Sequence, residues 1–190
     1  MSETSINHRF KFILAGDGAT GKTSLLNRIK YGHFKQVYHL TIGGDVVILD
    51  LLFKKRQVRL LCWDSGGQTR FSIVRQAFYR GAHGFIIVFD ITWRVSFDTV
   101  RSWYYEIQKT IPNIPWILVG NKVDLETDRQ ISKEEGVNLA TELGAISYIE
   151  CSAKTGIRIG KPLIQLIEHM FLHHGTGYSV DILEGSLSTE

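Results

Sequence analysis

Residues 16–24 read Gly16-Asp17-Gly18-Ala19-Thr20-Gly21-Lys22-Thr23-Ser24, which has the spacing Gly-x-x-x-x-Gly-Lys-Thr. An apolar run, residues 10–15, precedes this stretch, and residues 22–31 follow it with helical spacing. Glycines in such a loop allow close backbone approach to a phosphate, and the first N–H groups of the helix attract the anion. The alternative is an ordinary glycine-rich turn with a helix-capping Thr, which the full motif in this context disfavours.

Two side chains at the end of this phosphate loop (residues 16–23) suit a nucleoside triphosphate. Lys22 supplies a positive charge for the outer phosphates, and the Thr23 hydroxyl is placed to ligate Mg²⁺. We therefore predict a nucleoside triphosphate site here. The loop alone does not identify the base.

The composition is that of a globular chain of one domain. Its length of 190 residues is enough to bury a substantial core, and 44% hydrophobic and 22% charged residues are ordinary values. A net charge of +3 is too small to indicate nucleic acid as a partner. Cys62 and Cys151 lie in apolar runs outside any paired-cysteine motif, so a reducing, cytoplasmic setting is expected. No apolar run is long enough to cross a bilayer, and residues 1–8 do not resemble a signal peptide.

Strand-like and helical segments alternate along the chain. Patterning predicts strands at residues 9–15, 45–53, 57–64, 84–90, 115–121 and 147–151, and helices at residues 22–31, 73–79, 96–111, 132–143 and from residue 162. Continuous apolar strands belong in a parallel sheet that is covered on both faces. The short link Lys54-Lys55-Arg56 requires an antiparallel hairpin. We therefore predict an α/β fold of the P-loop NTPase type, a six-stranded, mostly parallel sheet with one antiparallel edge strand and helices on both faces.

Sequence periodicity also sets the limits of the domain. Residues 1–8 and 175–190 lack it and are expected to be flexible, which leaves residues 9–174 as one nucleotide-binding domain. On the last predicted helix, His169 and His173 have the i, i+4 spacing of metal ligands. Without a third ligand in view, we prefer a solvated helix face to a zinc site.

A second motif, Asn121-Lys122-Val123-Asp124, directly follows a predicted strand. The Asp124 carboxylate can accept both N–H groups on the Watson–Crick edge of guanine, whereas adenine offers no such pair of donors. Each lost hydrogen bond to a charged group costs about 1.5–3 kcal/mol, so this residue would select guanine. Asn121 can brace the loops, and the stem of Lys122 can cover the base. In isolation the motif is also a plausible turn, but its place after a strand and a phosphate loop favours a base site.

A third segment, residues 150–154 (Glu-Cys-Ser-Ala-Lys), would complete the base site, because the backbone N–H of Ala153 can bind the guanine carbonyl. With these motifs in this order, the chain resembles the Ras-like small GTPases over residues 9–174. Within them it is most similar to the Rab family, as an atypical member without C-terminal prenylation cysteines. The residues that carry the resemblance are Gly16 to Ser24, Thr41-Ile-Gly43, Trp63-Asp64-Ser-Gly-Gly67-Gln68, Phe78-Tyr-Arg-Gly-Ala82, Asn121 to Asp124 and Ser152 to Lys154.

The resemblance implies two segments whose conformation depends on the terminal phosphate. In switch I, residues 32–46, Phe34 would lie against the guanine and Tyr38 over the phosphates. Thr41 would complete the Mg²⁺ shell and offer its backbone N–H to the γ-phosphate.

In switch II, residues 64–82, Asp64 would hold Mg²⁺ through water. The Gly67 N–H would bind the γ-phosphate, and Gln68 would orient the attacking water. The implied cofactors are therefore GTP or GDP and Mg²⁺.

The predicted site residues fall into three overlapping sets. Those expected to bind the nucleotide are Asp17, Gly18, Ala19, Thr20, Gly21, Lys22, Thr23, Ser24, Phe34, Tyr38, Thr41, Gly67, Asn121, Lys122, Asp124, Leu125, Ser152, Ala153 and Lys154. Those expected to hold Mg²⁺ are Thr23, Thr41 and Asp64. Those expected to act in catalysis are Lys22, Thr41, Gly67 and Gln68.

Departures from the family pattern lie next to the predicted catalytic glutamine. The family usually has Asp-Thr-Ala-Gly-Gln-Glu where this chain has Asp64-Ser-Gly66-Gly-Gln68-Thr69. Two adjacent glycines loosen the backbone that must hold Gln68, and the missing acid at Thr69 removes a group that the family uses, so we expect slow intrinsic hydrolysis. Val46 replaces the usual Phe in an aromatic trio with Trp63 and Phe78, so the effectors are expected to differ from the usual set.

The predicted function is that of a Rab-like GTP/GDP molecular switch that hydrolyses GTP and acts in vesicle or membrane trafficking. One alternative is a GTP-binding scaffold with negligible hydrolysis, which the substitutions at Gly66 and Thr69 motivate. Another is a P-loop kinase of a small metabolite, which would leave Asn121 to Asp124 unexplained and would require an arginine-bearing lid.

The expected partners are an exchange factor, a GTPase-activating protein and effectors, which would bind through residues 32–46 and 64–82. We expect a monomer that does not bind nucleic acid. The sequence ends without a cysteine or a basic run, so contact with endomembranes is expected to be indirect or through a C-terminus absent from this chain.

Overall fold

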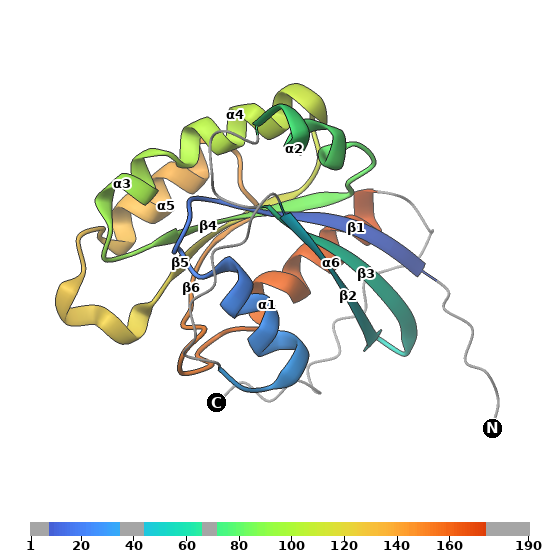
Figure 1. Ribbon diagram of the computed structural model, residues 1–190, viewed down its shortest axis with the longest axis horizontal. Helices are drawn as coiled ribbons and strands as arrows, with labels where there is room; N and C mark the ends of the chain where they lie inside the picture. Colours follow the sequence, from blue (N-terminus) through green and yellow to red (C-terminus); the bar gives the residue numbers. More distant parts are fainter. Residues whose placement is uncertain (1–7, 35–43, 66–71, 174–190) are drawn as a thin grey trace.

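The computed structural model describes residues 8–34, 44–65 and 72–173 of the chain (Figure 1). In this part of the chain, six strands form one sheet in the order β2-β3-β1-β4-β5-β6. The strands are β1 (His8–Ala15), β2 (Gly44–Phe53), β3 (Arg56–Ser65), β4 (Gly84–Asp90), β5 (Trp116–Asn121) and β6 (Tyr148–Glu150). The helices are α1 (Lys22–Tyr31), α2 (Ser72–Tyr79), α3 (Arg94–Asp98), α4 (Val100–Thr110), the 3₁₀ helix η2 (Val123–Asp128), α5 (Lys133–Glu142) and α6 (Lys161–His173).

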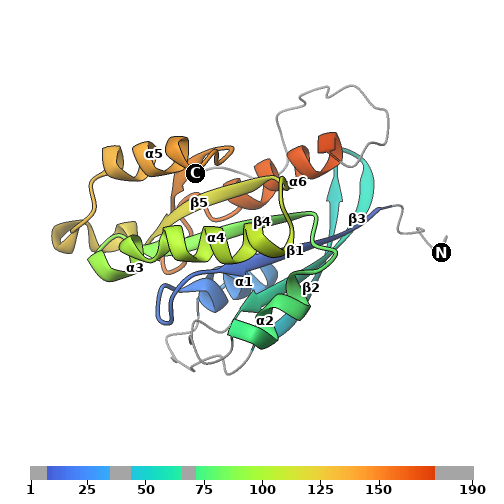
Figure 2. The same cartoon turned by 90° about the horizontal axis from the view of Figure 1, so that it is seen from above.

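Helices cover both faces of the sheet (Figures 1 and 2). Helices α1 and α6 lie on one face, and α2, α3, α4 and α5 lie on the other. Strand β1 shows how the sequence produces two cores, because successive side chains point to opposite faces. Phe12 and Leu14 pack into the core under α1 and α6, whereas Ile13 and Ala15 pack into the core under α4 and α5.

The predicted sheet is confirmed. All strand pairs are parallel except the hairpin of β2 and β3, which places β2 at the edge. In the parallel part, Leu14 pairs with Asp64 and Asp90 pairs with Asn121. The strands therefore deliver the phosphate loop and the loop after Asn121 to the same rim of the sheet.

The structure corrects the predicted helix over residues 96–111. Two helices, α3 and α4, occupy this region and are separated at Thr99. The Thr99 hydroxyl has two acceptors for its one hydrogen, a carboxylate oxygen of Asp17 at 2.9 Å and the Ser96 backbone oxygen at 3.1 Å. Backbone bonding continues across this point, because the Thr99 N–H donates to the Val95 oxygen and the Trp103 N–H donates to the Thr99 oxygen, both at 3.1 Å, so the interruption is confined to one residue.

Two smaller differences concern the edges of the predicted elements. His8, placed in the flexible N-terminal segment by the sequence, is the first residue of β1. The 3₁₀ helix η2 was not predicted, because the residues from Val123 to Asp128 show no clear apolar period. Within the described residues, every helix is too short or too polar to span a bilayer.

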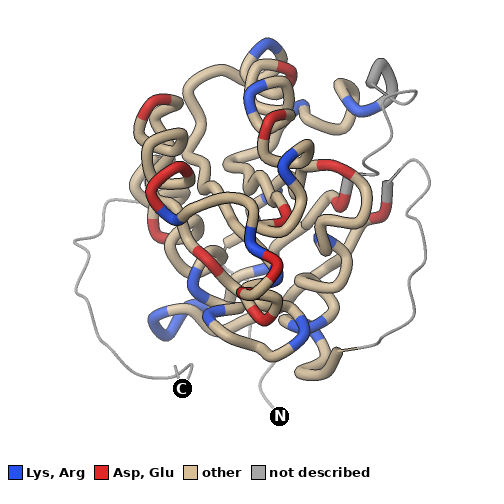
Figure 3. Tube along the Cα trace, turned by 90° about the vertical axis from the view of Figure 1, so that its left-hand side faces the viewer, with Lys and Arg blue, Asp and Glu red and all other residues tan. Residues whose placement is uncertain are grey.

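Charged residues of both signs are interspersed along the trace (Figure 3). Ion pairs between neighbouring helices use some of them, such as Arg94 with Glu135 and Arg101 with Glu142. Exposed pairs of this type contribute about 0.2–1 kcal/mol each, so most of the stability comes from the two apolar cores.

The predicted cap of α5 is present in full. The Glu135 backbone N–H donates to the Ser132 hydroxyl at 3.1 Å, and the Ser132 backbone N–H donates to the Glu135 carboxylate at 2.8 Å. The helix ends before Gly144, whose φ of +69° is the left-handed conformation that favours glycine.

We expect Ser132→Ala to lower the free energy of unfolding by about 1 kcal/mol, because the first turn of α5 loses its cap. Urea denaturation of the purified protein measures this change. Ser102→Ala, at an exposed position of α4, is the matched control and should change stability by less than about 0.5 kcal/mol. Equal effects of the two substitutions would show that the cap contributes nothing.

Candidate functional site

The phosphate loop connects β1 to α1 and has a backbone that only glycine permits at two points. Gly16 has a φ of +130°, and a Cβ there would lie 2.1 Å from the Val88 carbonyl oxygen. Gly21 has a φ of +94°, and a Cβ there would lie 2.3 Å from Nδ2 of Asn121. Contacts under 3.0 Å are not tolerated by real side chains, so both glycines are required by the packing as well as by conformation.

Lys22, the first residue of α1, points into the curve of this loop. Its Nζ donates hydrogen bonds of 2.7 Å to the backbone oxygens of Gly16 and Asp17. The side chain is only 6% exposed, and this burial lowers the pKa of Lys22 to about 8, although nearby Asp64 and Asp17 act in the opposite direction. The loop thus surrounds a buried cation, which suits an anionic ligand.

Asn121, at the end of β5, connects the phosphate loop to the loop after β6. Its Nδ2 donates to the Thr20 backbone oxygen at 2.8 Å, and its Oδ1 accepts from the Ala153 backbone N–H at 3.1 Å. Both Asn121 and Thr20 are fully or almost fully buried. One amide therefore holds together three segments that are distant in sequence.

Asp124 lies in η2, directly beyond this junction. Its Oδ1 accepts from the Ser152 hydroxyl at 2.5 Å, and its Oδ2 lies 3.8 Å from Nζ of Lys154. The Ser152 hydroxyl in turn accepts from the Thr155 backbone N–H at 3.0 Å. These contacts connect the carboxylate to the loop after β6, in which Ala153 lies.

Lys122 stands between the two parts of the motif in a left-handed conformation, with a φ of +70°. Its Nζ lies 2.6 Å from Oδ2 of Asp90, the last residue of β4. The Lys122 backbone oxygen accepts from the Leu125 N–H at 2.8 Å, which begins η2. Asp90 was not among the predicted site residues. Its position at the carboxyl end of a predicted strand, the end at which Asn121 also lies, could have indicated it.

Thr23 and Asp64 meet at the other side of the phosphate loop. The Thr23 hydroxyl donates to Oδ2 of Asp64, which is 1% exposed. Oδ1 of Asp64 has no hydrogen-bond partner among the described residues. Burial raises the pKa of Asp64, although the Thr23 hydrogen bond and Lys22 act to lower it.

This donor set fits a hard divalent cation. A hydroxyl and a carboxylate are the oxygen ligands that Mg²⁺ prefers, and a buried carboxylate oxygen without a partner is an acceptor left for a ligand. Elsewhere, His169 directs Nδ1 to the Gln165 backbone oxygen, 2.9 Å away.

The contacts above do not include every predicted site residue. Phe34 is half-buried and packs against the core under α1 and α6. Ser24 lies in the first turn of α1, and Gly18 and Ala19 lie in the phosphate loop. The remaining residues, Tyr38, Thr41, Gly67 and Gln68, lie outside the described residues.

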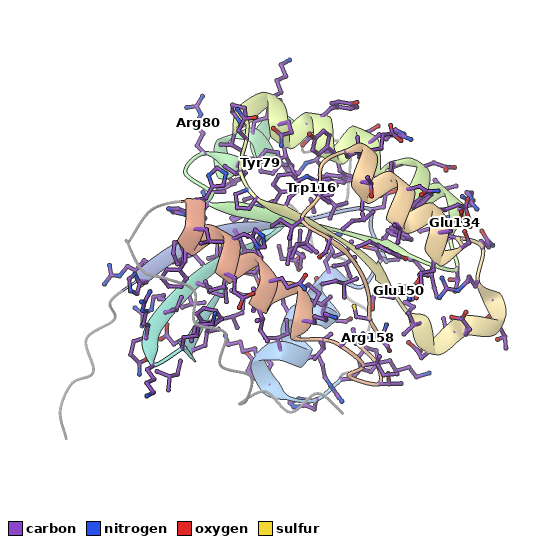
Figure 4. All side chains as sticks on the ribbon, turned by 180° about the vertical axis from the view of Figure 1, so that it is seen from behind. Tyr79, Arg80, Trp116, Glu134, Glu150 and Arg158 are labelled. Carbon is purple, nitrogen blue, oxygen red and sulfur yellow. The ribbon has the colours of Figure 1, made fainter. Side chains whose placement is uncertain are left out.

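Two further structural features connect elements around this site. Glu150, at the carboxyl end of β6 (Figure 4), accepts hydrogen bonds from Arg129 and Tyr148 and thereby ties η2 to β6. Trp63 stacks on Phe78 with ring centroids 3.7 Å apart, and Val46, its partner on β2, is 49% exposed. Trp63 is buried, so Val46 is the exposed member of this trio, which joins β2, β3 and α2.

We expect Asn121→Ala to lower the free energy of unfolding by about 1–3 kcal/mol, because the Thr20 oxygen and the Ala153 N–H lose their buried partner. Urea denaturation tests this in nucleotide-free protein. Asn138→Ala, at an exposed position of α5, is the control and should change stability by less than about 0.5 kcal/mol. Similar stabilities of both variants and the parent would contradict the assignment of Asn121 as a structural junction.

Comparison with known proteins agrees with this arrangement. The profile of the Ras family matches residues 11–172. GTP-binding protein ypt2 of Schizosaccharomyces pombe is 38% identical over 167 residues, which cover 87% of this chain and 83% of the relative. Ras-related protein Rab-13 of Canis lupus familiaris is 36% identical over 170 residues, 89% of this chain and 83% of the relative. Ras-related protein Rab-1 of Theileria parva is 39% identical over 157 residues, 82% of this chain and 71% of the relative.

The family match covers most of the chain, and these identities extend over more than two thirds of each relative. The phosphate loop, the Asn121 junction and the placement of Asp124 supply the structural counterpart of that similarity. The chain therefore belongs to the Ras family and is a Rab-like small GTPase.

Proposed function

We propose that this protein is a switch that retains GTP or GDP with Mg²⁺ at the carboxyl rim of its sheet, within one domain of residues 9–174. The observation that carries the proposal is the pair of hydrogen bonds made by the Asn121 side chain, which we call the Asn121 junction. They hold the phosphate loop, at Thr20, beside the loop after β6, at Ala153. A single ligand that spans both must carry phosphates at one end and a purine at the other.

The choice of guanine follows from the groups that surround the base position. The Asp124 carboxylate would accept the two N–H groups of guanine. The Ala153 N–H, which also donates to Oδ1 of Asn121, would share its hydrogen with the guanine carbonyl oxygen in a three-centre bond. Ser152 and Lys154 hold this carboxylate in place before the ligand arrives, which lowers the entropy lost on binding. An adenine base would leave the carboxylate without its two donors.

Thr23 and Asp64 would hold Mg²⁺, and Thr41 would complete its shell. When bound, the ion neutralises charge on the outer phosphates. Lys22 contributes the second positive charge from inside the phosphate loop, where burial strengthens its attraction for the nucleotide.

Hydrolysis would depend on Gln68, which would orient the attacking water, and on the Gly67 N–H, which would bind the γ-phosphate. Glycine at position 66 would allow this backbone more conformations than the alanine usual in the family, and Thr69 lacks a carboxylate. We infer slow intrinsic hydrolysis that a GTPase-activating protein would accelerate by ordering this segment.

Residues 32–46 and 64–82 would serve as the surfaces for an exchange factor, a GTPase-activating protein and effectors. The stacked pair of Trp63 and Phe78, with exposed Val46 beside it, suits an apolar effector surface. We place the protein as a monomer in membrane trafficking, with contact to endomembranes made through partners or through further chain.

Asp124→Asn tests the base site. We expect GDP affinity to fall by at least about 100-fold, because two hydrogen bonds to a carboxylate worth about 1.5–3 kcal/mol each are weakened. Titration calorimetry with GDP and Mg²⁺ measures the loss. Asp128→Asn makes the same change of charge at an exposed position of the same 3₁₀ helix and should bind GDP like the parent. Unchanged GDP affinity in Asp124→Asn would contradict the proposal.

Gly66→Ala tests the account of slow hydrolysis. Alanine restricts the backbone by about 0.4–1 kcal/mol relative to glycine, so a segment that must be ordered for reaction should react about two- to fivefold faster. Single-turnover hydrolysis of pre-bound GTP measures the rate, and GTP affinity measured in parallel shows that binding is unchanged. A rate no higher than that of the parent would argue against backbone freedom as the cause.

A further inference from the structure

The Asp17 carboxylate of the phosphate loop is held by residues at the start of α4. Oδ1 accepts from the indole N–H of Trp103 at 2.8 Å, and Oδ2 accepts from the Thr99 hydroxyl at 2.9 Å. The Asp17 backbone oxygen meanwhile accepts from Nζ of Lys22 at 2.7 Å. One residue therefore connects the buried ammonium inside the loop with a helix outside it.

Trp103 is in turn contacted by Arg75 of α2. Its side chain is buried, and the guanidinium of Arg75 lies 4.5 Å from the centroid of its ring, a cation–π arrangement. Arg75 is only 2% exposed and forms two hydrogen bonds with the Glu106 carboxylate, of 2.9 and 2.8 Å. Oε1 of Glu106 also accepts from the Tyr79 hydroxyl at 2.7 Å.

These contacts join two helices that pack on the same face of the sheet (Figures 1 and 2). Tyr79 lies in this helical layer above the sheet (Figure 4), and burial together with Glu106 raises its pKa far above the ordinary value, so its hydroxyl remains a donor. A buried guanidinium is costly without its carboxylate, so Arg75 holds α2 on α4 through a specific geometry.

We propose that Trp103 is a positioning residue of the phosphate loop, and that the pair of Arg75 and Glu106 couples the placement of α2 to the retention of guanine nucleotide. The proposal rests on the proposed function. If α2 moves, the guanidinium leaves the Trp103 ring, and the Asp17 carboxylate loses a fixed donor. A partner that binds α2, for example near the exposed Arg80 at its end (Figure 4), would thereby change the rate of nucleotide release.

The test measures dissociation of N-methylanthraniloyl-GDP from the Mg²⁺-loaded protein in the presence of excess GDP. Trp103→Phe removes the indole N–H and keeps a ring for Arg75, and we expect dissociation to be about tenfold faster. Glu106→Gln removes the charge that holds Arg75 and should accelerate dissociation by a smaller factor. The double variant should release nucleotide more slowly than the product of the two factors predicts, because both changes act through the same Trp103 contact.

Two matched controls separate positioning from general loosening of α4. Glu142→Gln makes the same chemical change in the exposed pair with Arg101 and should leave dissociation within about twofold of the parent. Thr99→Val removes the other hydrogen bond to Asp17. In the double variant with Glu106→Gln, the increase in dissociation rate should equal the product of the two single increases. Tyr79→Phe, which removes one hydrogen bond from Glu106, replaces Glu106→Gln if that variant does not fold.

The outcomes are distinct. Faster dissociation in the Trp103 and Glu106 variants with a non-multiplicative double variant supports the coupling. Dissociation rates that stay within about twofold of the parent, while urea midpoints fall, would overturn it and assign the contacts to stability alone. Failure of the parent protein to bind the GDP derivative would instead contradict the proposed function.

Discussion

The site depends on one arrangement, a phosphate loop closed around the buried ammonium group of Lys22. The two carbonyl oxygens that hold this group come from Gly16 and Asp17, and the loop can close only because Gly16 approaches the Val88 carbonyl without a Cβ. The same compact loop presents the Thr20 oxygen to Asn121. Phosphate binding, loop closure and the junction to the base loops are therefore consequences of one backbone conformation.

Around this arrangement, buried polar groups are paired in a way that sets their positions before a ligand is bound. Asn121 is satisfied by backbone groups on two loops, and Asp124 by Ser152. Asp64 differs, because one of its oxygens lacks a partner among the described residues, and burial raises its pKa. Preorganised groups favour the correct ligand at little entropic cost, whereas the unpaired oxygen is an acceptor that suits the proposed Mg²⁺.

Much of this could be predicted from local patterns. The alternation of strand-like and helical segments predicted a mostly parallel six-stranded sheet, and the short link at residues 54–56 predicted its antiparallel hairpin. The capping box predicted the start of α5. The contacts of Asp17 with Thr99 and Trp103 could not be predicted, because no local spacing relates residues more than 80 positions apart, as these are. The roles given to Thr41 and Gln68, which lie outside the described residues, stay predictions.

The most direct measurement is the identity of the nucleotide that the purified protein retains. Protein prepared in Mg²⁺ is denatured, and the released nucleotide is separated by anion-exchange chromatography beside guanosine and adenosine standards. A site built from Asn121, Asp124 and Ala153 predicts GDP or GTP in near-stoichiometric amount. Retention of an adenosine nucleotide, or no uptake of guanine nucleotide after incubation with GDP and Mg²⁺, would contradict the account.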